Sequence, residues 1–155
     1  MAELTKGDPA PDFEAQDGNG KTWRLSDLRG KKVILYFYPA DDTPGCTAEA
    51  CDFRDNMTIL EHAGYVVLGV SPQDSDSHQR FAQKYQLNFP LLVDEDMRMA
   101  KAYGALREKV GMWNDVPLHV ARSTFVIDEN GGLEQAIYGV NARGHVDTLK
   151  GSIGV

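Results

Sequence analysis

The chain has few of the side chains that bind metals. Its 155 residues include two cysteines and four histidines. The histidines (His62, His78, His119 and His145) are scattered without the spacing of a ligand set, and two cysteines supply two ligands at most. A glycine-rich phosphate loop and a serine nucleophile elbow are also missing from the sequence. We therefore expect neither a metal ion nor another cofactor.

Basic charge and long hydrophobic segments are scarce as well. The formal net charge of −7 and the pI near 5.0 argue against nucleic acids and anionic membranes as partners. The longest strongly apolar run, residues 33–38, is far too short to span a bilayer. The N-terminus lacks the apolar segment of a signal peptide, so we predict a cytoplasmic location. A permanent structural disulfide is not expected there, whereas an uncharged substrate is compatible with the charge balance.

The size and composition predict a single domain over residues 1–155. The apolar share of 42% and the charged share of 25% are ordinary for a soluble globular protein. A chain of this length buries enough surface to form one core without disulfides or a metal. No long linker, repeat or low-complexity segment divides it.

The apolar pattern predicts strands that alternate with helices. An N-terminal hairpin is expected over residues 13–25, around the turn DGNG. Further strands are expected at 33–38, 65–70, 89–93, 123–128 and 133–140, and helices at 44–62, after a cap at Ser75 or Asp76, at 97–103 and from 144. This order predicts an α/β domain with a mixed central sheet flanked by helices. It is compatible with a thioredoxin-like fold.

The most informative stretch is residues 39–51, PADDTPGCTAEAC. It follows a strand that we expect to be buried and begins a helix, the position where open α/β sheets form ligand sites. Thr43 is a good N-cap, and proline is favoured at the next position, Pro44. Cys46 then falls in the first turn, where unpaired N–H groups and the helix dipole favour the thiolate. Because the thiolate is the nucleophile, this placement raises reactivity.

The residues alone leave other interpretations of these side chains open. Cys46 can be a small buried apolar residue, but the strand-to-helix junction, the cap and the Pro-Gly turn favour a reactive thiol. Cys51 can be a resolving thiol or an unrelated core residue on the same helix. Asp41 and Asp42 are adjacent acids that we expect to be solvated or capping.

Over nearly its whole length the sequence resembles the peroxiredoxins, and among them the bacterioferritin comigratory protein or peroxiredoxin Q subfamily. The central match is residues 36–55, YFYPADDTPGCTAEACDFRD, with its specific Pro-x3-Thr-x2-Cys block. Residues 7–13 (GDPAPDF), 25–31 (LSDLRGK), 69–71 (GVS), 89–94 (FPLLVD) and 122–128 (RSTFVID) also match.

The resemblance implies a thioredoxin-like fold and a role for each matched residue. Cys46 would be the peroxidatic thiol, Thr43 would hydrogen-bond the peroxide, and Arg122 would hold the thiolate and the peroxide oxygens. Pro39 would shield the thiol, and Glu49 would support an arginine. Cys51 matches the resolving position of members that carry it within the same helix.

The activity implied is a thiol peroxidase that reduces hydrogen peroxide and organic hydroperoxides. Cys46 would become a sulfenic acid, Cys51 would form an intramolecular disulfide with it, and thioredoxin or a similar dithiol protein would reduce that disulfide. The alternatives are a peroxide-responsive redox sensor and a thiol–disulfide oxidoreductase. The latter usually carries a C-x-x-C pair, which this sequence lacks.

One segment departs from the family pattern. Members of the group carry a short glycine-containing segment before the matched arginine, and here residues 111–121 read GMWNDVPLHVA. We expect Met112 and Trp113 to be loop residues packed onto the core, with an exposed interface as the alternative. For the assembly we expect a monomer or a weak homodimer.

Overall fold

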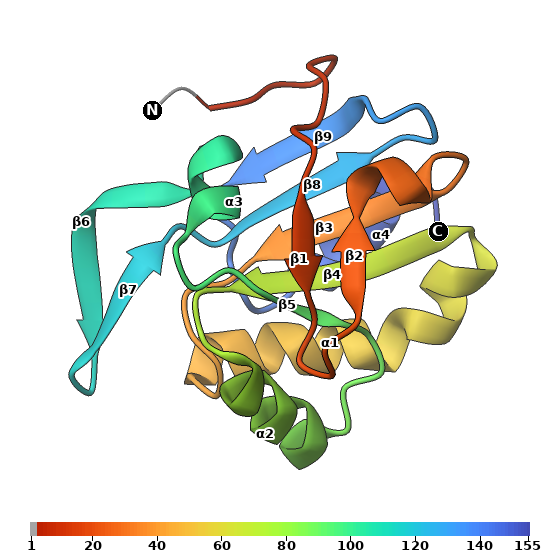
Figure 1. Ribbon diagram of the computed structural model, residues 1–155. Helices are drawn as coiled ribbons and strands as arrows, with labels where there is room; N and C mark the ends of the chain where they lie inside the picture. The colour runs from red at the N-terminus through yellow and green to blue at the C-terminus, as the bar shows by residue number, and fades with distance from the viewer. Residues whose placement is uncertain (1–2) are drawn as a thin grey trace.

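The computed structural model describes residues 3–155 and has a five-stranded mixed sheet at its centre, in the order β5-β4-β3-β8-β9 (Figure 1). Strand β3 pairs in parallel with β4 and antiparallel with β8. The prediction of a mixed central sheet is therefore confirmed. The strands of this sheet are β3 (Lys32–Phe37), β4 (Tyr65–Ser71), β5 (Leu91–Val93), β8 (Ser123–Ile127) and β9 (Leu133–Tyr138).

Side chains on the two faces of the sheet belong to separate apolar clusters. Ile34 and Tyr36 of β3 point into one cluster, and Leu35 and Phe37 into the other, as the two-residue period of a strand requires. All four are fully buried, which explains why the run over 33–38 is continuously apolar.

Helices cover one face, and the N-terminal segment covers most of the other (Figure 1). The first cluster takes in Phe53, Phe81 and Leu149 from α1 (Pro44–His62), α2 (Ser75–Tyr85) and α4 (His145–Ile153). The second takes in Phe13 and residues of the short helices η1 (Leu25–Leu28) and α3 (Arg98–Ala102), next to the hairpin of β1 (Glu14–Gln16) and β2 (Thr22–Arg24). The predicted N-terminal hairpin and helices are thus present.

Two predicted helix caps differ in the structure. Thr43 does occupy the N-cap position of α1, but its hydroxyl donates to the Ala40 carbonyl at 3.0 Å and makes no capping bond. Helix α2 is capped by Asp74, which accepts from the Ser77 amide at 2.9 Å, so the expectation of Ser75 or Asp76 is wrong. Asp74 is the N-cap because its extended backbone lets the carboxylate reach the unpaired amides of the first turn.

The segment before Arg122 forms a separate hairpin that the sequence patterns did not predict. Strands β6 (Leu106–Trp113) and β7 (Val116–Val120) pair with each other and project from the body of the molecule (Figure 1). Asn114 and Asp115 form the turn with positive φ angles of 44° and 65°, which these residue types tolerate. The Asn-Asp pair between residues 106–113 and 116–120 was the sequence signal that could have predicted this hairpin.

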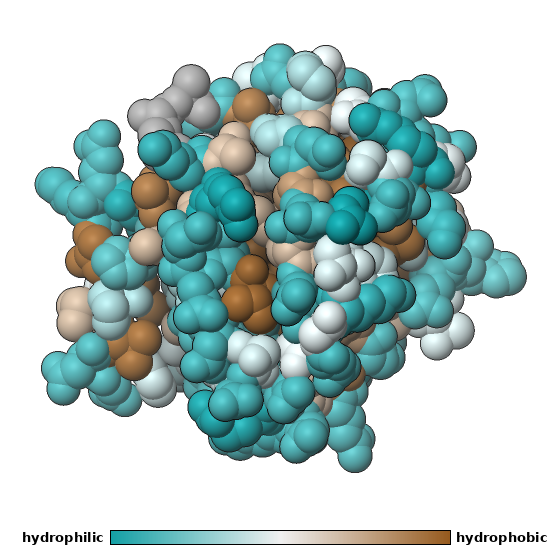
Figure 2. Space-filling view, in the orientation of Figure 1, coloured by the Kyte–Doolittle hydropathy of each residue, from teal (hydrophilic) through white to brown (hydrophobic). Residues whose placement is uncertain are grey.

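Met112 and Trp113 are exposed on this hairpin, by 62% and 38%, so the prediction that they pack onto the core is wrong. The hairpin pairs only with itself within the described part of the chain and therefore leaves one side without a sheet to pack on. Its apolar side chains are among the brown atoms at the left edge of Figure 2.

Across residues 3–155, every helix is too short or too polar to cross a bilayer.

Candidate active site

The site lies where β3 ends and α1 begins, at the carboxyl edge of the parallel strands. Cys46 is in the first turn of α1 and is 1% exposed. Phe37 at the end of β3 is paired with Ser123 at the start of β8. This register places Arg122, which directly precedes β8, beside the loop that leads to Cys46.

Arg122 joins two side chains of the first turns of α1. Its Nη2 donates to Cys46 Sγ at 3.3 Å, and its Nη1 donates to Glu49 Oε1 at 2.8 Å. Cys46 and Glu49 are three positions apart on the helix, so they face the same side. A Cβ added at Gly45 would lie 3.1 Å from Arg122 Nη2, and this close approach explains the glycine before the cysteine.

The carboxyl group of Glu49 is fully buried beneath this contact. Burial raises the pKa of Glu49 to about 7, although the charge of Arg122 and its hydrogen bond oppose the rise. Within residues 3–155, Glu49 Oε2 and the Tyr36 hydroxyl are buried with no hydrogen-bond partner. Burial also raises the pKa of Tyr36 well above its ordinary value, so Tyr36 stays neutral.

Arg122 is the charged side chain that faces the thiol. Burial lowers the pKa of Arg122, but Cys46 and Glu49 outweigh that effect, so its net pKa is raised. His145 is nearby, and burial together with Arg122 lowers the pKa of His145 to about 4. His145 is therefore neutral at pH 7 and hydrogen-bonds Thr124 at 2.9 Å, which leaves the guanidinium as the source of positive charge.

Pro39 and Thr43 belong to the loop in front of Cys46, and both are buried. The Thr43 hydroxyl donates its hydrogen to the Ala40 carbonyl. Its oxygen therefore retains lone pairs that can accept a hydrogen bond from a hydroperoxide. The Thr43 carbonyl accepts from the Thr47 amide at 2.8 Å, which fixes the first turn around Cys46. The structure thus gathers Pro39, Thr43, Cys46, Glu49 and Arg122 at one edge of the sheet.

Cys51 is not brought to Cys46. Both are free thiols of α1, and Cys51 is half-buried. Five residues of helix turn the chain through about 140°, so the two thiols leave the helix on different sides. Burial raises the pKa of Cys51, and the carboxylates of Asp52 and Asp55 add to the rise.

A shallow groove of about 640 Å³ runs along the first turns of α1. Its walls include Pro44 and Thr47 of α1, Tyr85 of α2 and Trp113 of the β6–β7 hairpin. The indole ring of Trp113 is therefore placed to report movement of this part of the helix.

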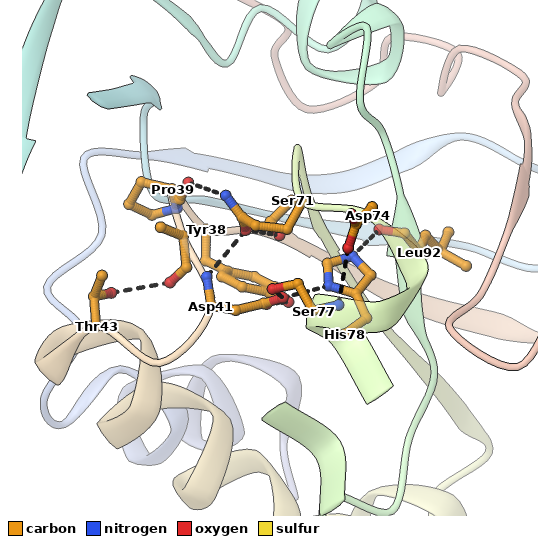
Figure 3. A network of polar contacts seen from close by, with 11 residues as sticks. Tyr38, Pro39, Asp41, Thr43, Ser71, Asp74, Ser77, His78 and Leu92 are labelled. Atoms are coloured by element: carbon orange, nitrogen blue, oxygen red, sulfur yellow. Dashed lines mark hydrogen bonds and ion pairs between the residues drawn. The ribbon is translucent and has the colours of Figure 1, made fainter. Parts of the chain in front are cut away.

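Asp41 also differs from the sequence-based expectation. Its side chain is only 4% exposed, and its carboxylate contacts Tyr38, Ser77 and His78 (Figure 3). The expectation that Asp41 is solvated or capping is wrong, because the loop turns it inward against α2. Asp42 does point outward, where hydrogen bonds from Lys84 and Tyr85 lower the pKa of Asp42. No sequence signal links Asp41 to a histidine 37 positions later.

A metal would need at least three ligands, and residues 3–155 bring no such group of His, Cys, Asp or Glu together.

The comparisons with known proteins agree with one another. The model of the AhpC/TSA family matches residues 6–136. Peroxiredoxin Bcp of Bacillus subtilis is 41% identical over 140 residues, covering 90% of this chain and 88% of its own. The crystal structure of a Xylella fastidiosa peroxiredoxin Q mutant superposes with a TM-score of 0.90 at 28% identity, covering 99% of this chain and 98% of its own.

A further solved relative is the bacterioferritin comigratory protein of Xanthomonas campestris, whose structures concern alkyl peroxide reduction. It matches with a TM-score of 0.83 and 31% identity over 92% of this chain and 90% of its own. These neighbours confirm the predicted thioredoxin-like fold. The chain belongs to the AhpC/TSA family, as a peroxiredoxin of the Bcp and peroxiredoxin Q type with the activity of a thiol peroxidase.

Proposed function

We propose that Cys46 is the peroxidatic thiol of this peroxidase. Its thiolate attacks one peroxide oxygen, so that an S–O bond forms while the O–O bond breaks. The sulfur is oxidised to a sulfenic acid, and the other oxygen leaves as water or an alcohol after it takes up a proton.

The observation that carries this assignment is the contact of Arg122 with Cys46 at 3.3 Å. A guanidinium beside a thiol favours the thiolate and offers further N–H donors to the oxygen on which charge develops. Thr43 is the acceptor for the peroxide hydrogen, Pro39 shields the thiol, and Glu49 holds Arg122 in place through its 2.8 Å bond.

Cys51 is the resolving thiol. It attacks the sulfenic acid of Cys46, the S–S bond forms and water leaves. A dithiol protein of the thioredoxin type then reduces the disulfide by two electrons and is itself oxidised. The position of Cys51 on the same helix supports this assignment, provided that the helix opens.

The substrates are hydrogen peroxide and organic hydroperoxides. The burial of Cys46 suits small molecules, and the Xanthomonas campestris relative is described by its alkyl peroxide reduction. We further propose that residues 1–155 form one domain and that the protein is cytoplasmic and a monomer or weak homodimer. Fractionation of cells and analytical ultracentrifugation test the last two points.

The test is a peroxidase assay with a thioredoxin recycling system, accompanied by intact mass after one equivalent of peroxide. We expect many turnovers per chain and a mass loss of about 2 Da, from a Cys46–Cys51 disulfide. A redox sensor would consume one equivalent only. A thiol–disulfide oxidoreductase would exchange with protein disulfides and leave peroxide unchanged.

A further inference from the structure

The buried ring of His78 has both nitrogens in contact with oxygen atoms (Figure 3). Its side chain is 0% exposed. Nε2 lies 2.8 Å from the Leu92 carbonyl of β5, and Nδ1 lies 2.6 Å from Asp41 Oδ2. A carbonyl oxygen can only accept a hydrogen bond, so Nε2 carries a hydrogen.

This arrangement requires one proton between Asp41 and His78. Either the imidazole is protonated and donates from Nδ1 to the carboxylate, or the carboxyl group is protonated and donates to Nδ1. In both cases the pair has no net charge, which suits its burial. The Asp41 carboxylate accepts two further hydrogen bonds, because Tyr38 donates to Oδ1 at 2.6 Å and Ser77 donates to Oδ2 at 2.8 Å.

The pair fixes the loop that leads to the reactive cysteine. Asp41 lies between Pro39 and Thr43, whereas Ser77 and His78 belong to the first turn of α2. The backbone of the same loop is also held, since the Asp41 amide donates to Gln73 Oε1 at 3.0 Å. Figure 3 shows these contacts converging on the loop from the end of β4 and from α2.

The two chemical steps make opposite demands on this loop. The reaction with peroxide needs Thr43 and Cys46 held against Arg122, whereas a Cys46–Cys51 disulfide needs the first turns of α1 to open. A contact that holds the loop therefore favours the first step and opposes the second. This reasoning rests on the proposed roles of Cys46 and Cys51.

We propose that Asp41 and His78 form a positioning pair that fixes the Pro39–Thr43 loop for the reaction with peroxide and restrains the opening that disulfide formation requires. Neither residue touches the reacting atoms. Loss of the pair should therefore slow sulfenic acid formation and accelerate disulfide formation. A side chain that only stabilises the fold would not change the two rates in opposite directions while the protein remains folded.

The test compares Asp41→Ala with Asp41→Asn. In Asp41→Asn the amide can donate to Nδ1 of neutral His78 and accept from Tyr38, so the pair is kept without its shared proton. In Asp41→Ala it is lost. The matched control is Asp128→Ala, which removes a carboxylate that accepts from the amides of Asn130 and Gly132 in the turn at the far end of β8.

Two rate constants are measured for each variant. Sulfenic acid formation is followed in a Cys51→Ser background by quenching and intact mass, and disulfide formation in chains with both cysteines. We expect Asp41→Ala to slow the first step about tenfold and to speed the second several-fold. Asp41→Asn should restore both constants to within about threefold of the wild-type values, and Asp128→Ala should leave both unchanged.

A gentler variant keeps the proposal testable if Asp41→Ala does not fold. Ser77→Ala removes one donor to Asp41 without leaving a charge unpaired, and it should move both constants in the same opposite directions by smaller factors. The proposal is wrong if both constants fall together, if Asp41→Asn behaves like Asp41→Ala, or if Asp128→Ala reproduces the effect. Absence of any sulfenic acid on Cys46 in the Cys51→Ser chain would instead contradict the proposed function.

Discussion

The two cysteines of α1 occupy contrasting environments on one helix. Cys46, in the first turn, is buried and accepts a hydrogen bond from Arg122. Cys51, five positions later, is half-buried, and burial and neighbouring carboxylates raise the pKa of Cys51. A guanidinium thus lies beside one sulfur, whereas burial disfavours charge on the other. We expect position relative to the helix start and to Arg122, rather than residue type, to set which thiol reacts first.

Removal of the first thiol should have the largest effect. Cys46→Ser should reduce peroxide consumption to the background rate, because burial and nearby carboxylates raise the pKa of Cys51 and outweigh the opposing charge of Arg54. The measurement is peroxide loss with thioredoxin recycling. Turnover comparable to that of the wild-type chain would show that Cys46 is not the peroxidatic thiol. Cys51 would then be the thiol that reacts with peroxide.

Removal of the second thiol should separate the two steps. Cys51→Ser should still react with one equivalent of peroxide but should lose sustained thioredoxin-dependent turnover. Its sulfenic acid should persist, or advance to sulfinic acid when peroxide is in excess. Intact mass after one and after ten equivalents checks this expectation. Continued recycling at the wild-type rate would mean that another group resolves Cys46.

Removal of the guanidinium should make Cys46 resemble Cys51 in reactivity. Arg122→Ala should slow sulfenic acid formation by about 10²–10³-fold, because both a cation beside the thiolate and donors to the developing oxygen charge are lost. Arg122→Lys is the matched comparison, since it keeps the charge but loses the planar fork that joins Cys46 to Glu49. If Arg122→Ala oxidises at the wild-type rate, the 3.3 Å contact has no part in catalysis.

The smallest expected effect concerns Glu49 and is seen in stability. The pKa of Glu49 is raised from 4.5 to about 7 in the folded protein, so the folded state binds more protons than the unfolded state between these values. This contribution to stability is fully present below pH 4.5 and is lost as the pH rises through 7. Relative to Glu49→Gln, which does not titrate, the wild-type free energy of unfolding should fall by up to about 3 kcal/mol over that range.

Denaturant unfolding of both chains at several pH values between 4 and 8 gives this difference directly. Parallel curves for the wild-type and Glu49→Gln chains would show that the pKa of Glu49 is the same in the folded and the unfolded state. The pair with Arg122 would then offset burial.

Much of the fold followed from local signals in the sequence. The apolar run over 33–38 and the Thr43-Pro44 start predicted β3 and α1, because a strand buried on both faces and a helix N-terminus each leave a composition signature. Arg122 entered the site only through the family resemblance. Its approach to Cys46 depends on the antiparallel pairing of β3 with β8, which local pattern does not specify.

Two features were missed, for different physical reasons. The inward turn of Asp41 toward His78 joins residues that are far apart in the chain, and an aspartate in a loop is ordinarily exposed. The β6–β7 hairpin has few buried residues, so it lacks the alternation that marks a half-buried strand.

The most direct test of the contrast between the cysteines is the behaviour of α1 on oxidation. In an intact helix the Cα atoms of residues five apart are separated by roughly 8.6 Å on sides about 140° apart. A disulfide requires Cα atoms within about 7 Å and converging Cβ vectors. The Cys46–Cys51 bond therefore cannot form while α1 persists through both residues.

The measurement is backbone amide exchange over residues 43–56 in the reduced and the oxidised protein, with the disulfide verified by mass spectrometry. The account predicts that protection in the first turns of α1 is lost on oxidation, while β3 and β4 remain protected. Equal protection of residues 43–56 in both forms, with the Cys46–Cys51 bond present, would contradict it.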